Sequence, residues 1–218
     1  MPKQSTLGKD AAFRRRLLAW YRAHARDLPW RRTRDPYRVL VSEFMLQQTQ
    51  VSRVLDYYGR FLGRYPSVAA LARARPSAVR EAWEGLGYYR RAANLHRLAK
   101  EVVRRHAGVV PADPQELRRL PGVGPYTAGA VAAFAYERPV AAVDTNVGRV
   151  IRRVFGSKTA KDTRTTAQLL QPKRGKTAWA FNQGLMELGA LVCRARAPKC
   201  DRCPVNNLCN WYSQSGNR

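Results

Sequence analysis

The chain lacks any long hydrophobic run. No stretch approaches the roughly 18 apolar residues that a membrane-spanning helix requires, and the first ten residues are polar, without the apolar segment of a signal peptide. No segment alternates apolar and polar residues with a period of two for more than a few positions, which argues against a β-sheet. We therefore expect an all-α protein that does not associate with a membrane.

Acidic residues are also scarce. The 218 residues include 15 Asp and Glu against 40 Lys and Arg, a net charge of +25. This excess is spread along the chain, so it predicts a polyanionic partner rather than a basic tail. The three histidines show no ligand spacing, and we assign them no role. The length suffices for one large or two small domains with a real core.

Cysteine is rare and confined to one place. The four cysteines are Cys193, Cys200, Cys203 and Cys209, in the spacing C-x6-C-x2-C-x5-C. A disulfide framework would normally spread its cysteines along the chain. Four thiolates this close suit a [4Fe–4S] cluster or a zinc ion. Composition alone leaves both open, although structural zinc more often uses two close pairs and this loop has one.

The most informative stretch runs from Leu120 to Asn146. It begins Leu-Pro-Gly-Val-Gly-Pro, in which Gly122 and Gly124 flank Val123 in a tight turn. Pro125 then suits the first turn of a helix that reaches about Tyr136. Upstream, residues 113–116 (Asp-Pro-Gln-Glu) predict an N-cap, a proline at the first helical position and a capping-box Glu. A short helix, a hairpin and a second helix therefore follow one another.

This hairpin is a candidate anion site. It is expected to present backbone N–H groups at a helix N-terminus, with Arg118 and Arg119 just before it, and phosphate is the natural ligand. An ordinary packing corner between two helices is the alternative.

Two acidic residues stand out. Asp144 is the only acid between Glu137 and Asp162, and it precedes a helix from Asn146 to about Phe155. It is either a plain N-cap or a carboxylate able to stabilise a sugar cation. Glu43 lies on a helix, Val39 to Gln48, that is apolar nearly all round and therefore buried. Such a Glu is either heavily paired or raised in pKa, which would make it a proton donor; a surface Glu is the alternative.

The remaining chain also predicts helices. Asp10 is expected to cap a first helix that contains Phe13 and Leu17, and residues 177–192 form the last strong helix. Residues 156–176 are polar and predict a loop-rich connection. The cysteine loop is expected to close the chain.

Together these motifs resemble the endonuclease III superfamily of DNA glycosylases, and from about Arg26 to Cys209 the catalytic domain of MutY-type adenine DNA glycosylases. The resemblance implies a two-lobed helix–hairpin–helix fold. One lobe would comprise six helices within residues 29–138. The other would combine residues 1–28 with 139–218 and carry a [4Fe–4S] cluster in the loop 193–209. The active cleft would lie between the lobes.

The resemblance also implies residue roles. Glu43, within Glu-x-Met-Leu-Gln-Gln-Thr, would protonate adenine N7, and Asp144 would shield or trap the C1′ cation before water completes hydrolysis. Tyr126 and Asn146 would orient the carboxylates and water. Flipping the nucleotide would use Gln48 and Tyr88 as wedges beside the opposing base. The adenine pocket would comprise Arg26, Leu28, Trp30, Arg31, Leu46 and Gln183. For Trp30 and Tyr88, core packing is the alternative.

Position 126 separates branches of the superfamily. A lysine there would form a Schiff base and cut the strand, so Tyr126 implies a monofunctional enzyme that leaves an abasic site. Two features depart from the adenine branch. Thr145 follows Asp144 where glycine is common, and the sequence ends at Arg218, before the position of the C-terminal domain that reads 8-oxoguanine in that branch, so that it is either a truncated or a naturally short form. We therefore expect modest discrimination of the opposing base.

The expected activity is excision of adenine mispaired with guanine or 8-oxoguanine in double-stranded DNA. The protein would act as a monomer in a prokaryotic cytoplasm, associated with the nucleoid. Two alternatives remain: a thymine or uracil mismatch glycosylase of the same superfamily, and a non-catalytic DNA-binding protein.

Overall fold

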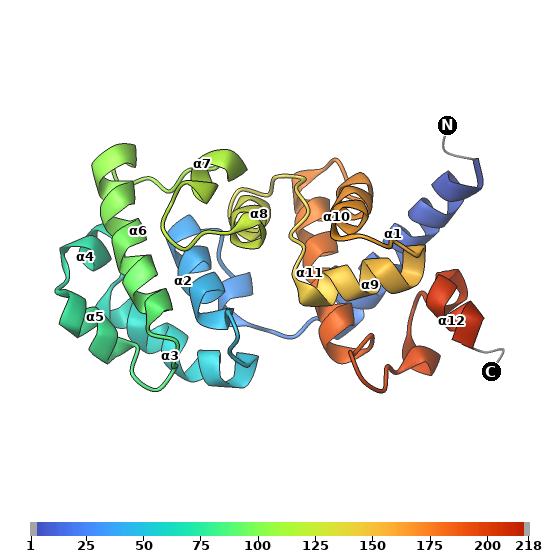
Figure 1. Ribbon diagram of the computed structural model, residues 1–218, viewed down its shortest axis with the longest axis horizontal. Coiled ribbons are helices and arrows are strands. Elements are labelled where there is room, and N and C mark those ends of the chain that lie inside the picture. The colour runs from blue at the N-terminus through green and yellow to red at the C-terminus, as the bar shows by residue number, and fades with distance from the viewer. Residues whose placement is uncertain (1–3, 216–218) are drawn as a thin grey trace. The chain divides into compact units, whose positions relative to one another are not determined.

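The computed structural model describes residues 4–215, with side chains from residue 8 to 214; Met1 to Lys3 lie outside the described residues. The described chain is helical and has no strand, as expected. It divides into two compact units (Figure 1). The continuous unit is Asp27–Tyr136. The split unit joins the N-terminal segment up to Arg26 to the chain from Glu137 onward.

The continuous unit is built around helix α2 (Pro36–Leu46), which packs against α3 (Val51–Arg64), α6 (Arg90–His106) and α8 (Pro125–Phe134). Eight consecutive or near-consecutive residues of α2 are buried, because neighbours cover the helix on nearly all sides. Its other elements are η1 (Pro29–Arg31), α4 (Val68–Arg73), α5 (Pro76–Ala82) and α7 (Pro114–Arg118). Apolar residues at three- and four-residue spacing explain the longer helices; on α6 these are Leu95, Leu98, Ala99 and Val102.

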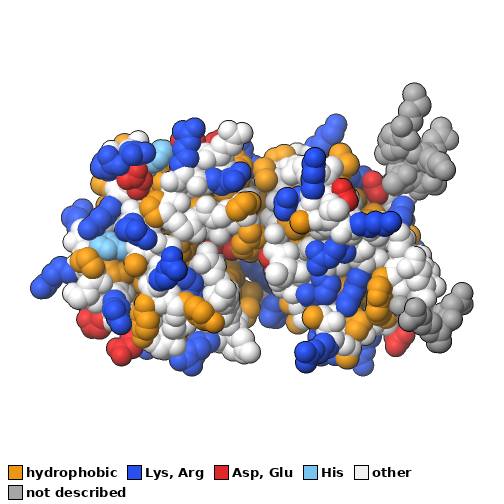
Figure 2. Space-filling view, viewed as in Figure 1, with side chains coloured by type: hydrophobic (Ala, Val, Ile, Leu, Met, Phe, Trp, Pro, Cys, Tyr) orange, Lys and Arg blue, Asp and Glu red, His pale blue; other side chains and the backbone are white. Residues whose placement is uncertain are grey.

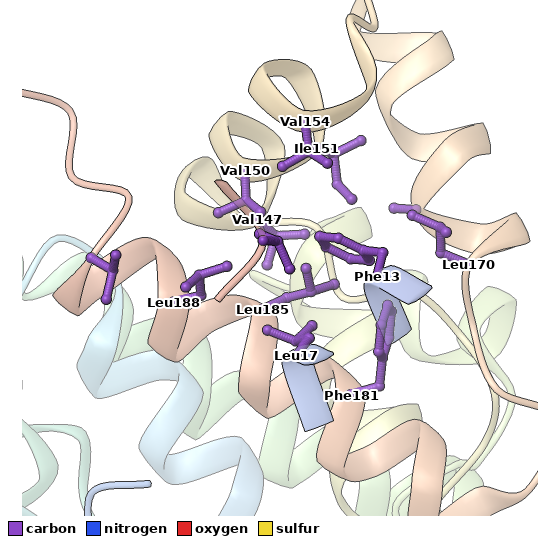
Figure 3. Packing of buried hydrophobic residues seen from close by; sticks show 13 residues of the cluster. Phe13, Leu17, Val147, Val150, Ile151, Val154, Leu170, Phe181, Leu185 and Leu188 are labelled. Atoms are coloured by element: carbon purple, nitrogen blue, oxygen red, sulfur yellow. The ribbon is translucent and has the colours of Figure 1, made fainter. Parts of the chain in front are cut away.

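The split unit is organised by α11 (Gly175–Leu191), which packs against α1 (Gln4–His24) and α9 (Thr145–Phe155). Its remaining elements are α10 (Ala160–Leu169), η2 (Cys200–Arg202), η3 (Asn206–Leu208) and α12 (Asn210–Ser215). The core joins the two ends of the chain (Figure 3). Phe13 of α1 makes edge-to-face contacts with Phe155 at 5.1 Å and with Phe181 at 6.1 Å between ring centroids.

Three sequence-based expectations about helix boundaries were wrong. Helix α1 begins at Gln4, so Asp10 lies inside the helix and not at its N-cap. Residues 156–176 contain α10, whose start is a capping box: Thr159 Oγ1 accepts from the Asp162 N–H, and the Asp162 carboxylate accepts from the Thr159 N–H. The chain also continues past the cysteine loop into α12. Helix α10 buries only Thr163 and Ala167, and this explains why it leaves little apolar signal.

Basic side chains are scattered over the visible face of both units, where acidic ones are fewer (Figure 2). Among the described residues, no helix is long and apolar enough to span a bilayer.

Candidate active site

The hairpin between α7 and α8 has the expected shape. Asp113 caps α7 by accepting from the N–H groups of Gln115 at 2.8 Å and Glu116 at 3.2 Å, and Pro114 takes the first helical position. Glu116 does not form the predicted capping box. Its carboxylate instead forms an ion pair with Arg119 at 2.8 Å. Both Arg118 and Arg119 are exposed.

Only one of the two hairpin glycines is required by the fold itself. Gly122 has a φ of 77°, and a Cβ there would lie 2.8 Å from Asn94 Cβ. Gly124 has an extended backbone, and a Cβ there would meet no atom within 4 Å. The N–H of Val123 donates to Leu120 O, whereas those of the two exposed glycines donate to no backbone carbonyl of the described chain. Two amides are therefore available to an anion.

Glu43 lies on α2 and is buried, with 5 % of its surface exposed. The helix begins at Pro36 and ends at Leu46, earlier at both ends than the expected Val39 to Gln48, and Asp35 caps it by accepting from the Arg38 N–H at 2.9 Å. Beyond Glu43, Gln47 Nε2 approaches Thr127 Oγ1 of α8 at 3.5 Å. Tyr126, which precedes Thr127, is partly exposed and lies near the N-terminus of α8. The continuous unit therefore carries a buried acid, a tyrosine and the hairpin amides.

Asp144 lies in the split unit, where it caps α9. One carboxylate oxygen accepts from the Val147 N–H at 2.7 Å, and the other accepts from Asn146 Nδ2 at 3.0 Å. Burial raises the pKa of this carboxyl, while the hydrogen bonds from Val147 and Asn146 and the charge of Arg149 oppose that rise. The residue is thus an N-cap whose carboxylate is held in a fixed orientation and is partly desolvated.

A chain of hydrogen bonds leads from Asp144 to the cysteine loop. Asn146 Oδ1 accepts from Arg149 Nη2 at 2.7 Å. The same guanidinium donates to Gly189 O at 2.8 Å and to Cys193 O at 2.7 Å. Because Arg149 binds both Asn146 and the first residue of the loop, it fixes the start of α9 relative to the loop. Sequence reasoning missed Arg149, since Gly189 and Cys193, two of its three partners, are contributed by α11 and the loop.

The proposed base-pocket residues fall into both units. In the continuous unit, Leu28 and Trp30 are buried, and Trp30 packs edge-to-face on Tyr58 at 5.4 Å between ring centroids. The core-packing alternative for Trp30 is therefore at least part of its role. Arg31 and Leu46 are partly exposed.

In the split unit, Gln183 is buried on α11, and Arg26 is partly exposed. Arg26 donates to the fully buried carboxylate of Glu187 at 2.6 Å and 3.0 Å. Glu187, which sequence reasoning missed, thus holds Arg26 in a bidentate ion pair.

The two proposed wedge residues are exposed and have unusual backbones. Tyr88 exposes 61 % of its surface, which excludes core packing for it, and Gln48 is also exposed. Their φ angles are 48° and 57°, in the left-handed region that bulky residues rarely adopt.

The four cysteines line one pocket, together with Arg153 and apolar residues of α9 and α11. Among the described residues, no three potential ligands gather closely enough to hold a single metal ion. A [4Fe–4S] cube takes one thiolate per iron and therefore has ligands spaced more widely than those of zinc. Burial raises the pKa of Cys203 to about 11, so the thiolate needs a bound cation. Arg153 donates to Cys193 Sγ at 3.4 Å and to Arg194 O at 2.7 Å.

Comparison with known proteins agrees with this arrangement. Residues 41–174 match the family model of the HhH-GPD superfamily of base excision DNA repair proteins. Residues 193–209, which contain all four cysteines, match the iron–sulfur binding domain of endonuclease III. The chain therefore belongs to the helix–hairpin–helix GPD superfamily of base excision DNA repair proteins. More particularly, it is a DNA N-glycosylase with a [4Fe–4S] cluster loop.

Its relatives include enzymes of two specificities. An adenine DNA glycosylase of Mycolicibacterium smegmatis is 48 % identical over 203 residues, which is 90 % of this chain and 68 % of the relative. A thymine-DNA glycosylase of Aeropyrum pernix is 41 % identical over 215 residues, 94 % of this chain and 96 % of the relative. Among solved structures, a thermostable thymine-DNA glycosylase superposes with a TM-score of 0.91 at 33 % identity, covering 97 % of this chain and 100 % of that one.

Gly189 offers a test of the support behind Asp144. A Cβ at this position would lie 2.7 Å from Asn146 Cβ and 3.1 Å from its carbonyl oxygen. We expect Gly189→Ala to displace Asn146 and with it the carboxylate of Asp144, and so to lower single-turnover excision by about 10- to 100-fold. Circular dichroism and iron content would show that the variant is folded and loaded.

Gly148→Ala is the matched control on α9. A Cβ there would meet the flexible end of Arg152 at 3.3 Å, and Thr163 Cγ2 and Val143 Cγ1 at the ordinary contact distance of 3.9 Å. Its excision rate is expected to stay within threefold of the parent. Equal rates for both alanine variants would show that the contact between Gly189 and Asn146 does not position Asp144.

Proposed function

We propose that this chain excises adenine opposite guanine or 8-oxoguanine in double-stranded DNA, by hydrolysis, and leaves an abasic site. The observation that carries the proposal is the burial of Glu43 on α2, in the sequence Glu-Phe-Met-Leu-Gln-Gln-Thr. Removal of a carboxyl from water favours its neutral form, which is the form that donates a proton. Adenine leaves readily only when its ring nitrogen accepts a proton.

The reaction also requires an ionised carboxylate, and Asp144 is proposed to be that group. Departure of the base leaves an oxocarbenium-like sugar, which a nearby carboxylate stabilises. The two hydrogen bonds from Val147 and Asn146 orient the Asp144 carboxylate and favour its ionised form. Glu43 is thus proposed to act protonated and Asp144 ionised, and the hydrogen bonds to Asp144 oppose the rise in pKa that its burial causes.

Access to the base requires that the nucleotide leave the duplex. Gln48 and Tyr88 are the proposed wedges, supported by their exposure. The hairpin amides of Gly122 and Gly124, with Arg118 and Arg119, are proposed to bind the backbone of the distorted strand. The net charge of +25 supplies the sequence-independent part of the affinity.

A second candidate is excision of thymine or uracil from mismatches with guanine. The Aeropyrum pernix relative and the superposed thymine-DNA glycosylase structure favour it, since both match this chain over nearly their whole length. The adenine proposal is preferred because relatives named adenine DNA glycosylase reach 48 % and 45 % identity, and because the residues from Glu43 to Thr49 match the adenine branch.

One experiment separates the candidates. Labelled duplexes containing A opposite G, A opposite 8-oxoguanine, T opposite G and U opposite G are incubated with the protein and then treated with alkali. We expect cleavage after alkali only at adenine. Cleavage of the T and U duplexes without the adenine ones would establish the second candidate, and binding without any cleavage would leave a non-catalytic DNA-binding protein.

Asp144→Asn separates the structural role of this residue from the chemical one. Asparagine is as good an N-cap as aspartate, so the cap on α9 should persist. The amide cannot balance a sugar cation, and we expect single-turnover excision to fall by at least about 100-fold with duplex affinity retained. Excision within tenfold of the parent would make Asp144 a cap and nothing more.

The pH dependence of stability gives this variant a second readout. Because the folded pKa of Asp144 is raised, the folded state holds the proton more tightly than the unfolded one. The wild type should therefore lose stability as pH rises from the unfolded value, about 3.9, through the raised folded value. The Asn variant should lack this loss and be at least as stable as the wild type at pH 7.

Tyr126→Lys tests the monofunctional assignment. The chain has no lysine between Lys100 and Lys158, so no amine lies near the hairpin in sequence. A lysine at 126 should attack C1′ of the abasic product and give strand cleavage, with a covalent DNA adduct trapped by borohydride. Tyr126→Phe is the matched control and should give no adduct. An active Lys variant without adduct would show that residue 126 does not face the sugar.

A further inference from the structure

Arg91 is a buried arginine without a carboxylate partner. It lies on α6, exposes 7 % of its surface, and forms no ion pair among the described residues. Burial lowers the pKa of its guanidinium from the ordinary value. A buried charge without a counter-ion is costly unless hydrogen bonds compensate it. The contacts of the Arg91 guanidinium must therefore explain how the fold tolerates this buried charge.

Those contacts are five backbone carbonyls from two separate segments. Nη1 donates to Phe44 O at 3.2 Å, to Met45 O at 2.7 Å and to Gln47 O. Nη2 donates to Leu86 O and to Gly87 O, both at 3.1 Å. The first set is the C-terminal end of α2, where carbonyls have no intrahelical partner and a cation is favourable. The second set is the loop before α6.

Two of these carbonyls immediately precede the proposed wedge residues in the chain. Gln47 O belongs to the peptide unit that leads into Gln48, and Gly87 O belongs to the one that leads into Tyr88. The orientation of each peptide unit sets the φ angle of the residue that follows it. Gln48 and Tyr88 are two of the few non-glycine residues with left-handed φ. The guanidinium also lies over the Tyr88 ring, 5.3 Å from its centroid.

We propose that Arg91 is the positioning residue for the DNA wedge: one guanidinium holds the Gln47 and Gly87 carbonyls and thereby presents Gln48 and Tyr88 together before DNA arrives. This inference rests on the wedge role in the proposed function. Backbone strain at exposed residues persists only where the surroundings impose it, and Arg91 is that constraint at both positions. A lysine cannot replace it, because one ammonium cannot reach two separated sets of carbonyls.

The test compares Arg91→Lys and Arg91→Met with Arg53→Met. Arg53 is the matched control, since it donates to Gly85 O of the same loop at 2.9 Å but is exposed and binds one carbonyl. Thermal unfolding and iron content confirm that each protein is folded and loaded.

Single-turnover excision is then measured on two duplexes. In one, adenine lies opposite guanine; in the other, it lies opposite an abasic site, where no opposing base needs a wedge. We expect both Arg91 variants to lose about 100-fold on the first duplex and less than tenfold on the second, with Arg53→Met near wild type on both. Equal losses on the two duplexes would mean that Arg91 acts through α2 and Glu43 or through general stability, and would overturn the proposal.

A second measurement needs no chemistry. In the Asp144→Asn background, a 2-aminopurine beside the target nucleotide reports unstacking by its fluorescence. Arg91→Met should abolish the rise in fluorescence on binding, and adding it to Gln48→Ala/Tyr88→Ala should cause no further loss. An additive loss would refute the assignment.

The experiments can contradict the wedge-positioning role of Arg91 and the adenine specificity independently of one another. If the wild type excises thymine and not adenine, the same pair of duplexes is built with thymine, and Arg91 is judged on that pair. If the wild type excises neither, the fluorescence comparison decides.

Discussion

The irregular segments of this protein are held by arginine side chains that donate to backbone carbonyls. Arg91 binds carbonyls at the end of α2 and in the loop before α6, Arg149 binds those of Gly189 and Cys193, and Arg153 binds those of Arg194 and Ala195. A loop cannot satisfy its own carbonyls as a helix does. The guanidinium, with five donors in a planar fork, satisfies several at once. The positions of Gln48, Tyr88, Asn146 and the cysteine loop all depend on this interaction.

Asp144 shows how one residue serves structure and chemistry together. As an N-cap it needs an oxygen near the first amides of α9, and that need fixes where its carboxylate lies. Asn146, two residues along, then uses its amide to orient the second oxygen. Gly189 permits this because α11 approaches Asn146 too closely for any Cβ. The proposed cation-stabilising group is therefore rigid before substrate binds, which is the condition for electrostatic catalysis.

Local chemistry was predictable from the sequence, and long-range contacts were not. The caps at Asp113 and Asp144 were predicted because each depends on a few consecutive residues. The all-helical class and the cysteine loop followed for the same reason. Helix α10 was missed because its buried face is small. Glu187, Arg91 and Arg149 were missed because each has a partner far away in the chain: Glu187 meets Arg26 161 residues earlier, Arg91 meets Met45 46 residues earlier, and Arg149 meets Cys193 44 residues later. A resemblance assigns roles to the residues of family motifs but does not disclose the residues that support them.

An arginine bonded to carbonyl dipoles leaves its positive charge uncancelled, whereas the charge of an arginine bonded to a carboxylate is balanced by its partner. The scaffold of these loops is therefore built without cancelling the attraction of the molecule for a polyanion. The same arginine side chains consequently set the local geometry of the loops and contribute to the long-range attraction of a polyanion. A neutral substitution at such a site changes the rate of association with DNA and the shape of the bound complex together. Association kinetics measured at low and high ionic strength separate the two effects. Salt screens the change in association rate and leaves the change in the shape of the bound complex.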